Sequence, residues 1–123
     1  MQVGEWMVRN VAFADADESL DVALARLRAS GRGSVPVMRD GKLLGILRAR
    51  AANAPGASDL SVGQAMEPVG VVLRAAERVE DAFRRMPDGI DVPVIDRGRL
   101  VGVTSRADLG ACLRADDLTP WLE

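Results

Sequence analysis

Two polar residues near the end of the chain, Ser105 and Asp108, are spaced for joint chemistry. They lie three residues apart at the start of a helix expected over 106–113, so both fall on one side of its first turn. A carboxylate at this position can accept hydrogen bonds from both hydroxyls of a ribose, and a hydroxyl at a helix N-terminus lies where anions are stabilised. The same spacing is typical of a capping box, in which the serine oxygen accepts from a backbone N–H. The pair therefore predicts either a ligand site or a helix cap.

The basic residues could add an anion site. Lys42 is the only lysine, and every other basic residue is arginine, which binds phosphate with two parallel hydrogen bonds. Arg48 and Arg50 follow one expected strand and Arg106 follows another. If the ends of these strands meet, the guanidinium groups could hold a polyphosphate. The alternative is that most of these arginines lie on solvated faces.

Composition excludes several other kinds of chemistry. The chain has no histidine, a single cysteine (Cys112), a net charge of −2 and 3% aromatic residues. No nucleophile, base and orienting group can be assembled from these residues, so we expect no enzyme activity. No intrachain disulfide and no cysteine-based metal site can form. The acidic balance argues against nucleic-acid and membrane partners. No apolar run is long enough to span a bilayer and no leader is evident, so we expect a cytoplasmic protein.

The sequence contains an internal repeat. Pro36-Val37-Met38 recurs as Pro93-Val94-Ile95 and Gly45-Ile46 recurs as Gly102-Val103, both 57 residues later (93 − 36 and 102 − 45), while Val3-Gly4-x-x-Met7 recurs as Val62-Gly63-x-x-Met66. We expect one repeat over 1–56 and another over 57–123, with 54–58 as the linker between them. Each repeat is too small to bury a comfortable core alone, so the two should form one module.

Each repeat is expected to place a helix before a hairpin. Apolar residues spaced at i, i+3, i+4 and i+7 predict the two helices: Leu20, Ala23, Leu24 and Leu27, then Val79, Ala82, Phe83 and Met86. Gly31 should end the first helix, and Pro87-Asp88-Gly89 the second. A short extended segment precedes each helix, near 11–14 and 69–74.

The hairpins and the helices that follow them complete each repeat. Strands are expected over 34–39 and 43–47 around the turn Asp40-Gly41, and over 91–96 and 100–104 around Arg97-Gly98. A second helix follows each hairpin, at 49–53 and 106–113. Pro93 has no N–H, so we expect an interrupted strand ladder that leaves backbone groups at 90–92 for a ligand.

This order of elements resembles that of the CBS domain. The residues that carry the resemblance are Val92-Pro93-Val94-Ile95-Asp96, Leu100-Val101-Gly102-Val103 and Ser105-Arg106-Ala107-Asp108-Leu109, with Val35-Pro36-Val37-Met38 and Leu43-Leu44-Gly45-Ile46 in the first repeat. The resemblance covers the chain from about Val3 to about Leu113. It implies a mixed α/β (α+β) fold, a tandem pair or Bateman module. Two β-α-β-β-α repeats would be related by a pseudo-two-fold axis, with small sheets packed on helices.

The resemblance also implies a regulatory function. Such pairs commonly bind AMP, ADP, ATP or S-adenosylmethionine in the cleft between repeats, dimerise, and regulate a partner protein, which here is unknown; no cofactor is required. The resemblance implies that Asp108 binds the ribose, that Ser105 binds the phosphate, and that the backbone around the Pro93 strand binds the adenine. We expect the binding residues to be Ser105, Asp108, Arg106, Thr104, Ile90, Val92, Pro93 and Arg48. The alternative is a dimerisation scaffold without ligand.

The two repeats are not equivalent at this site. Arg48 and Ala51 occupy the positions that Ser105 and Asp108 hold in the second repeat. The ribose-binding carboxylate is therefore missing from the first repeat. We expect one competent site, which contains Asp108, while the other is empty or altered.

Overall fold

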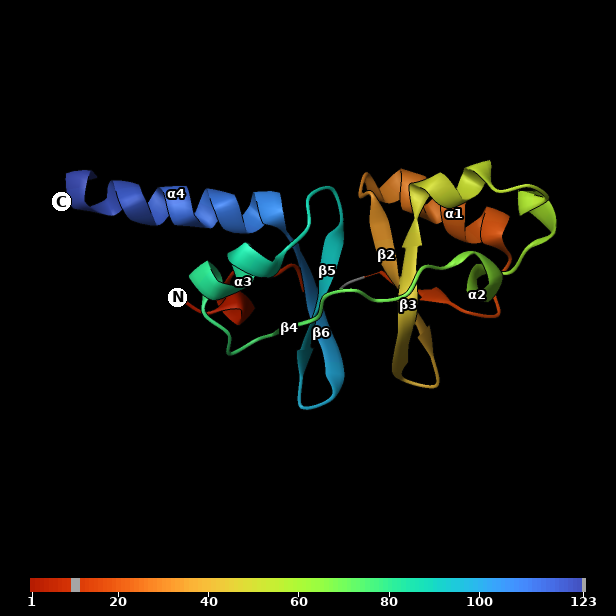
Figure 1. Cartoon of the computed structure of the whole chain (residues 1–123), viewed down its shortest axis with the longest axis horizontal. Helices are drawn as coiled ribbons and strands as arrows, with labels where there is room; N and C mark the ends of the chain where they lie inside the picture. The colour runs from red at the N-terminus through yellow and green to blue at the C-terminus, as the bar shows by residue number, and fades with distance from the viewer. Residues whose placement is uncertain (10–11, 123) are drawn as a thin grey trace. The chain divides into compact units, whose positions relative to one another are not determined.

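The computed structural model describes the backbone of residues 1–9 and 12–122 and the side chains of 1–9 and 12–114. The chain forms two compact units, one of Ala12–Gly70 and one of Val71–Glu123 together with Met1–Val11. Each unit has a three-stranded sheet with helices (Figure 1), so the expected mixed α+β fold is confirmed. No helix among the described residues is both long and apolar enough to cross a bilayer.

The sheet of the Ala12–Gly70 unit has the order β1-β2-β3. Its strands are β1 (Ala14–Asp15), β2 (Ser34–Arg39) and β3 (Lys42–Arg48), with β1 parallel to β2 and β2 antiparallel to β3. Helix α1 (Leu20–Ser30) connects β1 to β2 and buries the predicted apolar stripe. Gly31 ends α1 in the left-handed conformation, with φ of 72°, as its lack of a Cβ predicts.

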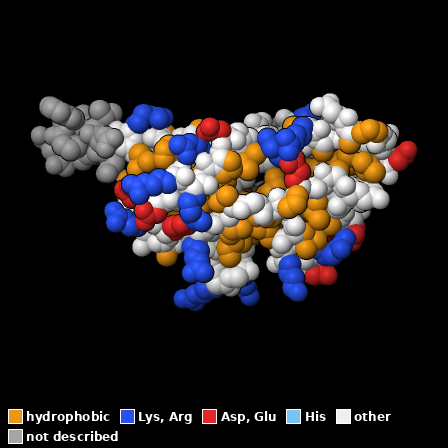
Figure 2. Space-filling model, viewed as in Figure 1, with side chains coloured by type: hydrophobic (Ala, Val, Ile, Leu, Met, Phe, Trp, Pro, Cys, Tyr) orange, Lys and Arg blue, Asp and Glu red, His pale blue; other side chains and the backbone are white. Residues whose placement is uncertain are grey.

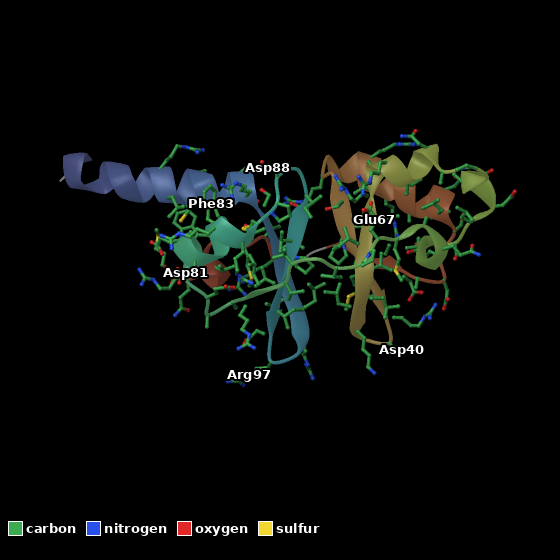
Figure 3. All side chains as sticks on the ribbon, in the orientation of Figure 1. Asp40, Glu67, Asp81, Phe83, Asp88 and Arg97 are labelled. Atoms are coloured by element: carbon green, nitrogen blue, oxygen red, sulfur yellow. The ribbon has the colours of Figure 1, made fainter. Side chains whose placement is uncertain are left out.

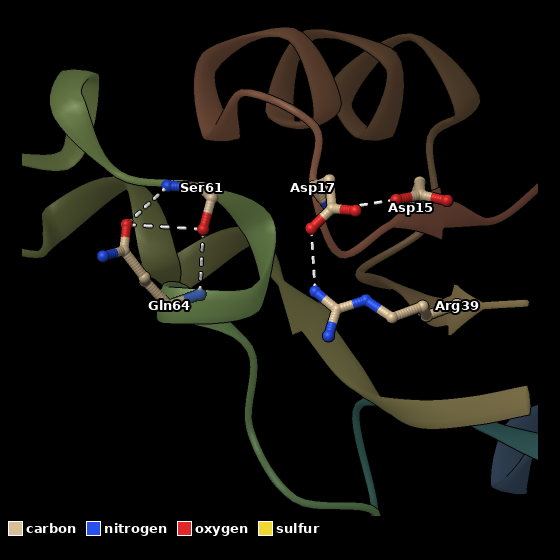
Figure 4. A network of polar contacts seen from close by, with 5 residues as sticks. All are labelled: Asp15, Asp17, Arg39, Ser61 and Gln64. Atoms are coloured by element: carbon tan, nitrogen blue, oxygen red, sulfur yellow. Dashed lines mark hydrogen bonds and ion pairs between the residues drawn. The ribbon is translucent and has the colours of Figure 1, made fainter.

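Three short helical segments follow this hairpin. They are the 3₁₀ helices η2 (Ala49–Asn53) and η3 (Ala57–Asp59) and the α-helix α2 (Val62–Ala65). The segment 49–53 is thus helical as predicted, but it is a single short 3₁₀ stretch. Ser61 and Gln64 cap α2 reciprocally, because each side chain accepts a hydrogen bond from the other residue's backbone N–H (Figure 4).

The Val71–Glu123 unit repeats this plan. It contains η1 (Val3–Glu5), β4 (Leu73–Arg74), α3 (Val79–Arg85), β5 (Asp91–Asp96), β6 (Arg99–Ser105) and α4 (Arg106–Leu122). Strand β5 lies in the middle of the sheet, parallel to β4 and antiparallel to β6. Apolar residues from the sheet, α3 and α4 form its core, among them Leu73, Val79, Val94 and Leu109. Helix α4 extends beyond the predicted end at 113.

Both hairpin turns have the backbone that the sequence predicts. Asp40 and Gly41 have φ of 51° and 77°, and Arg97 and Gly98 have 52° and 77°. Two successive positive φ angles define the type I′ turn, whose twist matches that of the flanking strands. Asp40 and Arg97 lie at the hairpin tips (Figure 3), where Figure 2 shows basic side chains.

The N-terminal Val-Gly segment of each sequence repeat packs against the hairpin-bearing part of the other. The N–H groups of Val3 and Gly4 donate to the carbonyls of Glu77 and Ala75, both at 2.8 Å. In the Ala12–Gly70 unit, the N–H groups of Val62 and Gly63 donate in the same way to Glu18 and Ala16, at 2.9 and 2.8 Å. The compact units therefore differ in extent from the sequence repeats, whose boundaries at 1–56 and 57–123 remain predictions.

The residues after these Val-Gly pairs explain the repeated glycine of the hairpins. Val8 exchanges two backbone hydrogen bonds with Val103, at 2.8 and 3.1 Å. A Cβ on the neighbouring Gly102 would lie 2.7 Å from the carbonyl oxygen of Val8 and 2.7 Å from Met7 Sδ. Gly45 stands in the same relation to the carbonyl oxygen of Glu67, also at 2.7 Å. Only glycine permits the crossing segment to approach so closely.

Candidate functional site

Ser105 and Asp108 meet at the junction of β6 and α4. The backbone N–H of Ser105 donates to Asp108 Oδ2 at 3.2 Å, and the N–H of Asp108 donates to Ser105 Oγ at 3.0 Å. The structure therefore brings the predicted pair together as a capping box. Ser105 Oγ acts as an acceptor in this contact, and a hydroxyl also has an O–H to donate.

Asp91 lies on the same side of the sheet as Ser105, although it is not among the residues predicted for the site. These two residues are direct partners in the β5–β6 register, so their side chains share one face. Asp91 is buried, with 6% of its surface exposed. A signal was available in the sequence, because Asp91 is a carboxylate that directly precedes four apolar residues of the strand. Two carboxylates, Asp91 and Asp108, thus accompany Ser105 at this end of the sheet.

Arg106 is engaged by the C-terminus of α3. Its guanidinium donates to the carbonyls of Phe83 and Met86 at 2.6 and 3.2 Å and lies 3.3 Å from the Asp88 carboxylate. It also stacks on the Phe83 ring, 3.9 Å from the centroid. Carbonyls at a helix C-terminus lack partners within the helix and favour a cation. Arg106 would have to give up these contacts in order to bind a phosphate.

Arg48 belongs to the other compact unit and pairs with a carboxylate there. Its guanidinium lies 4.0 Å from Glu67 Oε1, and Arg50 donates to both oxygens of the same carboxylate, with Nε 2.8 Å from Oε2. The hydrogen bond from Arg50 lowers the pKa of Glu67, and the charges of Arg50 and Arg48 act in the same direction against the effect of burial. Within their own unit, Arg48 and Arg50 therefore form a cluster around Glu67.

The β5 residues predicted to bind a ligand face different directions. Val92 is 1% exposed, packs in the core and pairs with Thr104 across the hairpin, so neither its side chain nor its backbone is open to a ligand. Ile90 precedes the strand and is partly buried against the same core. Pro93 pairs with Val103, whose N–H and C=O both bond to Val8 and so point away from β5. The missing N–H of Pro93 therefore interrupts no bond between β5 and β6, and its effect on a ligand site remains a prediction.

Thr104 is fully buried. It pairs with Val92 across the hairpin and therefore faces the core, on the opposite side of β6 from Ser105. Its hydroxyl has no hydrogen-bond partner. The corresponding residue of the other repeat is Leu47, which is also fully buried. Thr104 thus occupies a core position that its sequence repeat fills with an apolar side chain.

Other chemistry-bearing residues are scarce in the described part of the chain. Among the residues whose positions are described, no group of three His, Cys, Asp or Glu side chains could hold a metal ion. Cys112 is 1% exposed in the core, with its Sγ 3.6 Å from Met1 Sδ. Its surroundings agree with the packing role that its apolar neighbours indicate.

Comparison with known proteins identifies the family. Residues 3–51 and 61–113 each match the model of the CBS domain. The chain belongs to the CBS domain family. Its two matched segments make it a tandem CBS pair, and such pairs are typically regulatory, nucleotide-sensing modules.

Solved structures of CBS proteins have the same fold. The CBS-pair protein CBSX2 from Arabidopsis thaliana is 24% identical with a TM-score of 0.81, and the match covers 94% of this chain and 96% of that one. CBSX2 in complex with AMP is also similar, at 24% identity, a TM-score of 0.75 and coverage of 94% and 98%. A CBS-domain containing protein from Agrobacterium tumefaciens is 25% identical, with a TM-score of 0.76 and coverage of 92% and 99%. No curated protein sequence matches the chain.

Proposed function

We propose that this CBS pair senses an adenosyl ligand, namely AMP, ADP, ATP or S-adenosylmethionine, and transmits binding to a partner protein. The observation that carries the proposal is the meeting of Ser105 and Asp108 at the end of β6, with Asp91 on the same face as Ser105. Membership of the CBS family and the similarity to CBSX2, which has been solved in complex with AMP, support the choice of ligand. The expected position of the site, in a cleft between the repeats, remains a prediction.

Each residue of the proposed site has a chemical role. The Asp108 carboxylate accepts hydrogen bonds from the ribose hydroxyls, and the Ser105 O–H donates to a phosphate oxygen. A backbone group at Ile90, which precedes β5 and is only partly buried, binds the adenine edge. The capping box keeps Ser105 and Asp108 in fixed positions before the ligand arrives, so little side-chain entropy is lost on binding.

One ligand per chain is expected at a site of this kind. The position of Ser105 is taken in the first repeat by Arg48, which lies beside Glu67, and the position of Asp108 is taken by Ala51. Alanine cannot accept from a ribose. Dimerisation and a cytoplasmic location remain part of the proposal.

The test is a calorimetric titration with the four ligands, using wild type, Asp108→Ala and Asp108→Asn. We expect one ligand to bind wild type and neither variant, because the amide of asparagine replaces one acceptor with a donor. Ser61→Ala is the matched control, since it removes a capping box from α2 in the other unit and should leave affinity unchanged. A ligand that binds all four proteins equally would refute a role for Asp108.

The contacts at the junction of β6 and α4 also favour a second function, a dimerisation scaffold without ligand. Ser105 and Asp108 satisfy each other's backbone N–H groups, and Arg106 is committed to α3, as a purely structural junction requires. A CBS pair with such a junction could act as a dimerisation scaffold. A ligand at 100 times its Kd raises the stability by about 2.7 kcal/mol. If none of the four ligands shifts the melting temperature while sedimentation gives a dimer, the scaffold is the function.

A further inference from the structure

Two arginines at the end of β3 share one carboxylate. Arg50 binds both oxygens of Glu67, and the Arg48 guanidinium lies 4.0 Å from the same group. Figure 3 labels Glu67 beside the C-terminal end of β3, and Figure 2 shows basic side chains gathered there around a carboxylate. The side chains of Arg48, Arg50 and Glu67 are 31%, 61% and 33% exposed, so solutes can reach the cluster. Its net charge is positive, because two guanidinium groups face one carboxylate.

Backbone hydrogen bonds hold Glu67 at this position. Its N–H and C=O exchange hydrogen bonds of 2.8 and 2.9 Å with Ile46, two residues before Arg48. In the other unit, Val8 makes the same pair of bonds with Val103. The residues that correspond to Arg48 and Arg50 there are Ser105 and Ala107. The carboxylate and both guanidiniums are therefore particular to the Ala12–Gly70 unit.

We propose that Arg48 and Arg50 form a binding site for phosphate-bearing anions, which Glu67 occupies from within the chain. A guanidinium that binds a carboxylate with two hydrogen bonds presents the geometry that phosphate requires. A phosphate chain carries several charges against the single charge of Glu67, so it can interact with both arginines at once. Glu67 competes only modestly, because an exposed ion pair changes an equilibrium by no more than about fivefold.

This proposal rests on the proposed function in one respect only: the phosphate of an adenosyl ligand would be one natural source of the anion. Inorganic tripolyphosphate has the same phosphate chemistry and no adenosine. A titration with tripolyphosphate therefore tests this site without involving the ribose role of Asp108.

The experiment compares calorimetric titrations of tripolyphosphate into wild type, Glu67→Gln and Asp17→Asn at low ionic strength. We expect Glu67→Gln to bind about two- to fivefold more tightly than wild type, because the competing charge is gone. Asp17→Asn makes the same change in net charge and also frees an arginine, since Asp17 accepts from Arg39 at 2.8 Å in an exposed pair (Figure 4). This control should bind like wild type, as only one arginine is available there.

The gain must depend on both arginines. Adding Arg48→Gln or Arg50→Gln to Glu67→Gln should return the affinity to the wild-type value or below it. Equal binding by Glu67→Gln and Asp17→Asn would overturn the proposal, as would a gain that survives loss of both arginines. Arg48→Gln and Arg50→Gln in the wild-type background give a second measurement, since each should weaken tripolyphosphate binding.

The two proposals fail in different ways. If no adenosyl ligand binds but Glu67→Gln gains tripolyphosphate affinity, the adenosyl-sensing proposal fails and the anion site stands. If an adenosyl ligand binds through Asp108 but Glu67→Gln shows no gain, the anion site alone is refuted.

Discussion

Replacing Gly102 with alanine should destabilise the protein through a contact that only the folded chain contains. The added Cβ would lie 2.7 Å from the carbonyl oxygen of Val8 and 2.7 Å from Met7 Sδ. The thioether is flexible and can move away. The Val8 carbonyl can move away only if the two backbone hydrogen bonds between Val8 and Val103 break. The segment of Met7 and Val8 must therefore lift from β6.

The expected loss follows from the contacts that this movement breaks. The two hydrogen bonds contribute about 1 kcal/mol each. Met7 is 9% exposed in the core, and its partial exposure costs roughly another 1 kcal/mol. Replacing glycine with alanine restricts the unfolded chain and returns about 0.5–1 kcal/mol. The net loss is about 2 kcal/mol, which corresponds to a fall in melting temperature of about 8 °C for a domain of this size.

Urea unfolding of wild type, Gly102→Ala and Gly70→Ala measures this loss. Gly70 has no heavy atom within 4 Å of the Cβ position and no positive φ, so it is the matched control and should change the free energy of unfolding by less than about 0.5 kcal/mol. Gly45→Ala should behave like Gly102→Ala, because its Cβ would meet the Glu67 carbonyl at 2.7 Å. If Gly102→Ala is as stable as Gly70→Ala, or if adding Met7→Ala restores its stability, the reasoning is refuted.

Three further predictions concern single side chains. Thr104→Val should raise the free energy of unfolding by about 1 kcal/mol, because it replaces a buried hydroxyl that has no partner with a methyl group of similar size; urea unfolding measures this. Arg106→Met should lower it by about 1–2 kcal/mol, since the carbonyls at the end of α3 lose their cation and Phe83 loses its stacked guanidinium; Arg106→Lys should recover less than half. The Glu67 pKa is lowered by Arg50, so this pair stabilises the fold above the ordinary pKa of a glutamate, and the stabilisation is lost as the pH falls through the lowered value. Wild type should exceed Glu67→Gln by less than about 1 kcal/mol at pH 7, and the difference should disappear on acidification.

Each of these predictions has an outcome that contradicts it. Destabilisation by Thr104→Val would mean that its hydroxyl has a partner in solution. Full recovery in Arg106→Lys would mean that charge alone matters, without stacking or the paired carbonyl contacts. A difference between wild type and Glu67→Gln that grows on acidification would reverse the sign of the linkage.

Local elements follow closely from short stretches of sequence. Asp40-Gly41 predicts the first hairpin because the two residues tolerate positive φ. Both strands of each hairpin lie within one residue of their predicted bounds. Gly31 ends α1 for the same reason. The apolar stripe of α1 is buried as its spacing predicts. Phe83 departs from its own predicted stripe, since it is only partly buried and carries the Arg106 guanidinium on its ring.

The candidate site was predictable only in part. The three-residue spacing of Ser105 and Asp108 predicts that they meet, because one helical turn brings them together. Asp91 joins them through strand register, which depends on where the hairpin turns. The engagement of Arg106 by α3 was not predictable, since it depends on how α4 packs against the end of another helix.

The sequence by itself determined the duplication, the two hairpins, the α1 stripe and the CBS family, because each of these is written in neighbouring residues or in repeated motifs. Only the tertiary structure decided that each Val-Gly segment packs into the unit formed by the other repeat's hairpin. The reason why Gly45 and Gly102 are glycines, and the pairing of Glu67 with Arg48 and Arg50, follow from that exchange. These features join segments far apart in the chain. The local sequence of a Val-Gly segment does not determine against which of the two similar hairpins it packs. The choice depends on which arrangement buries Val3 and Val62 and satisfies their backbone groups at the same time.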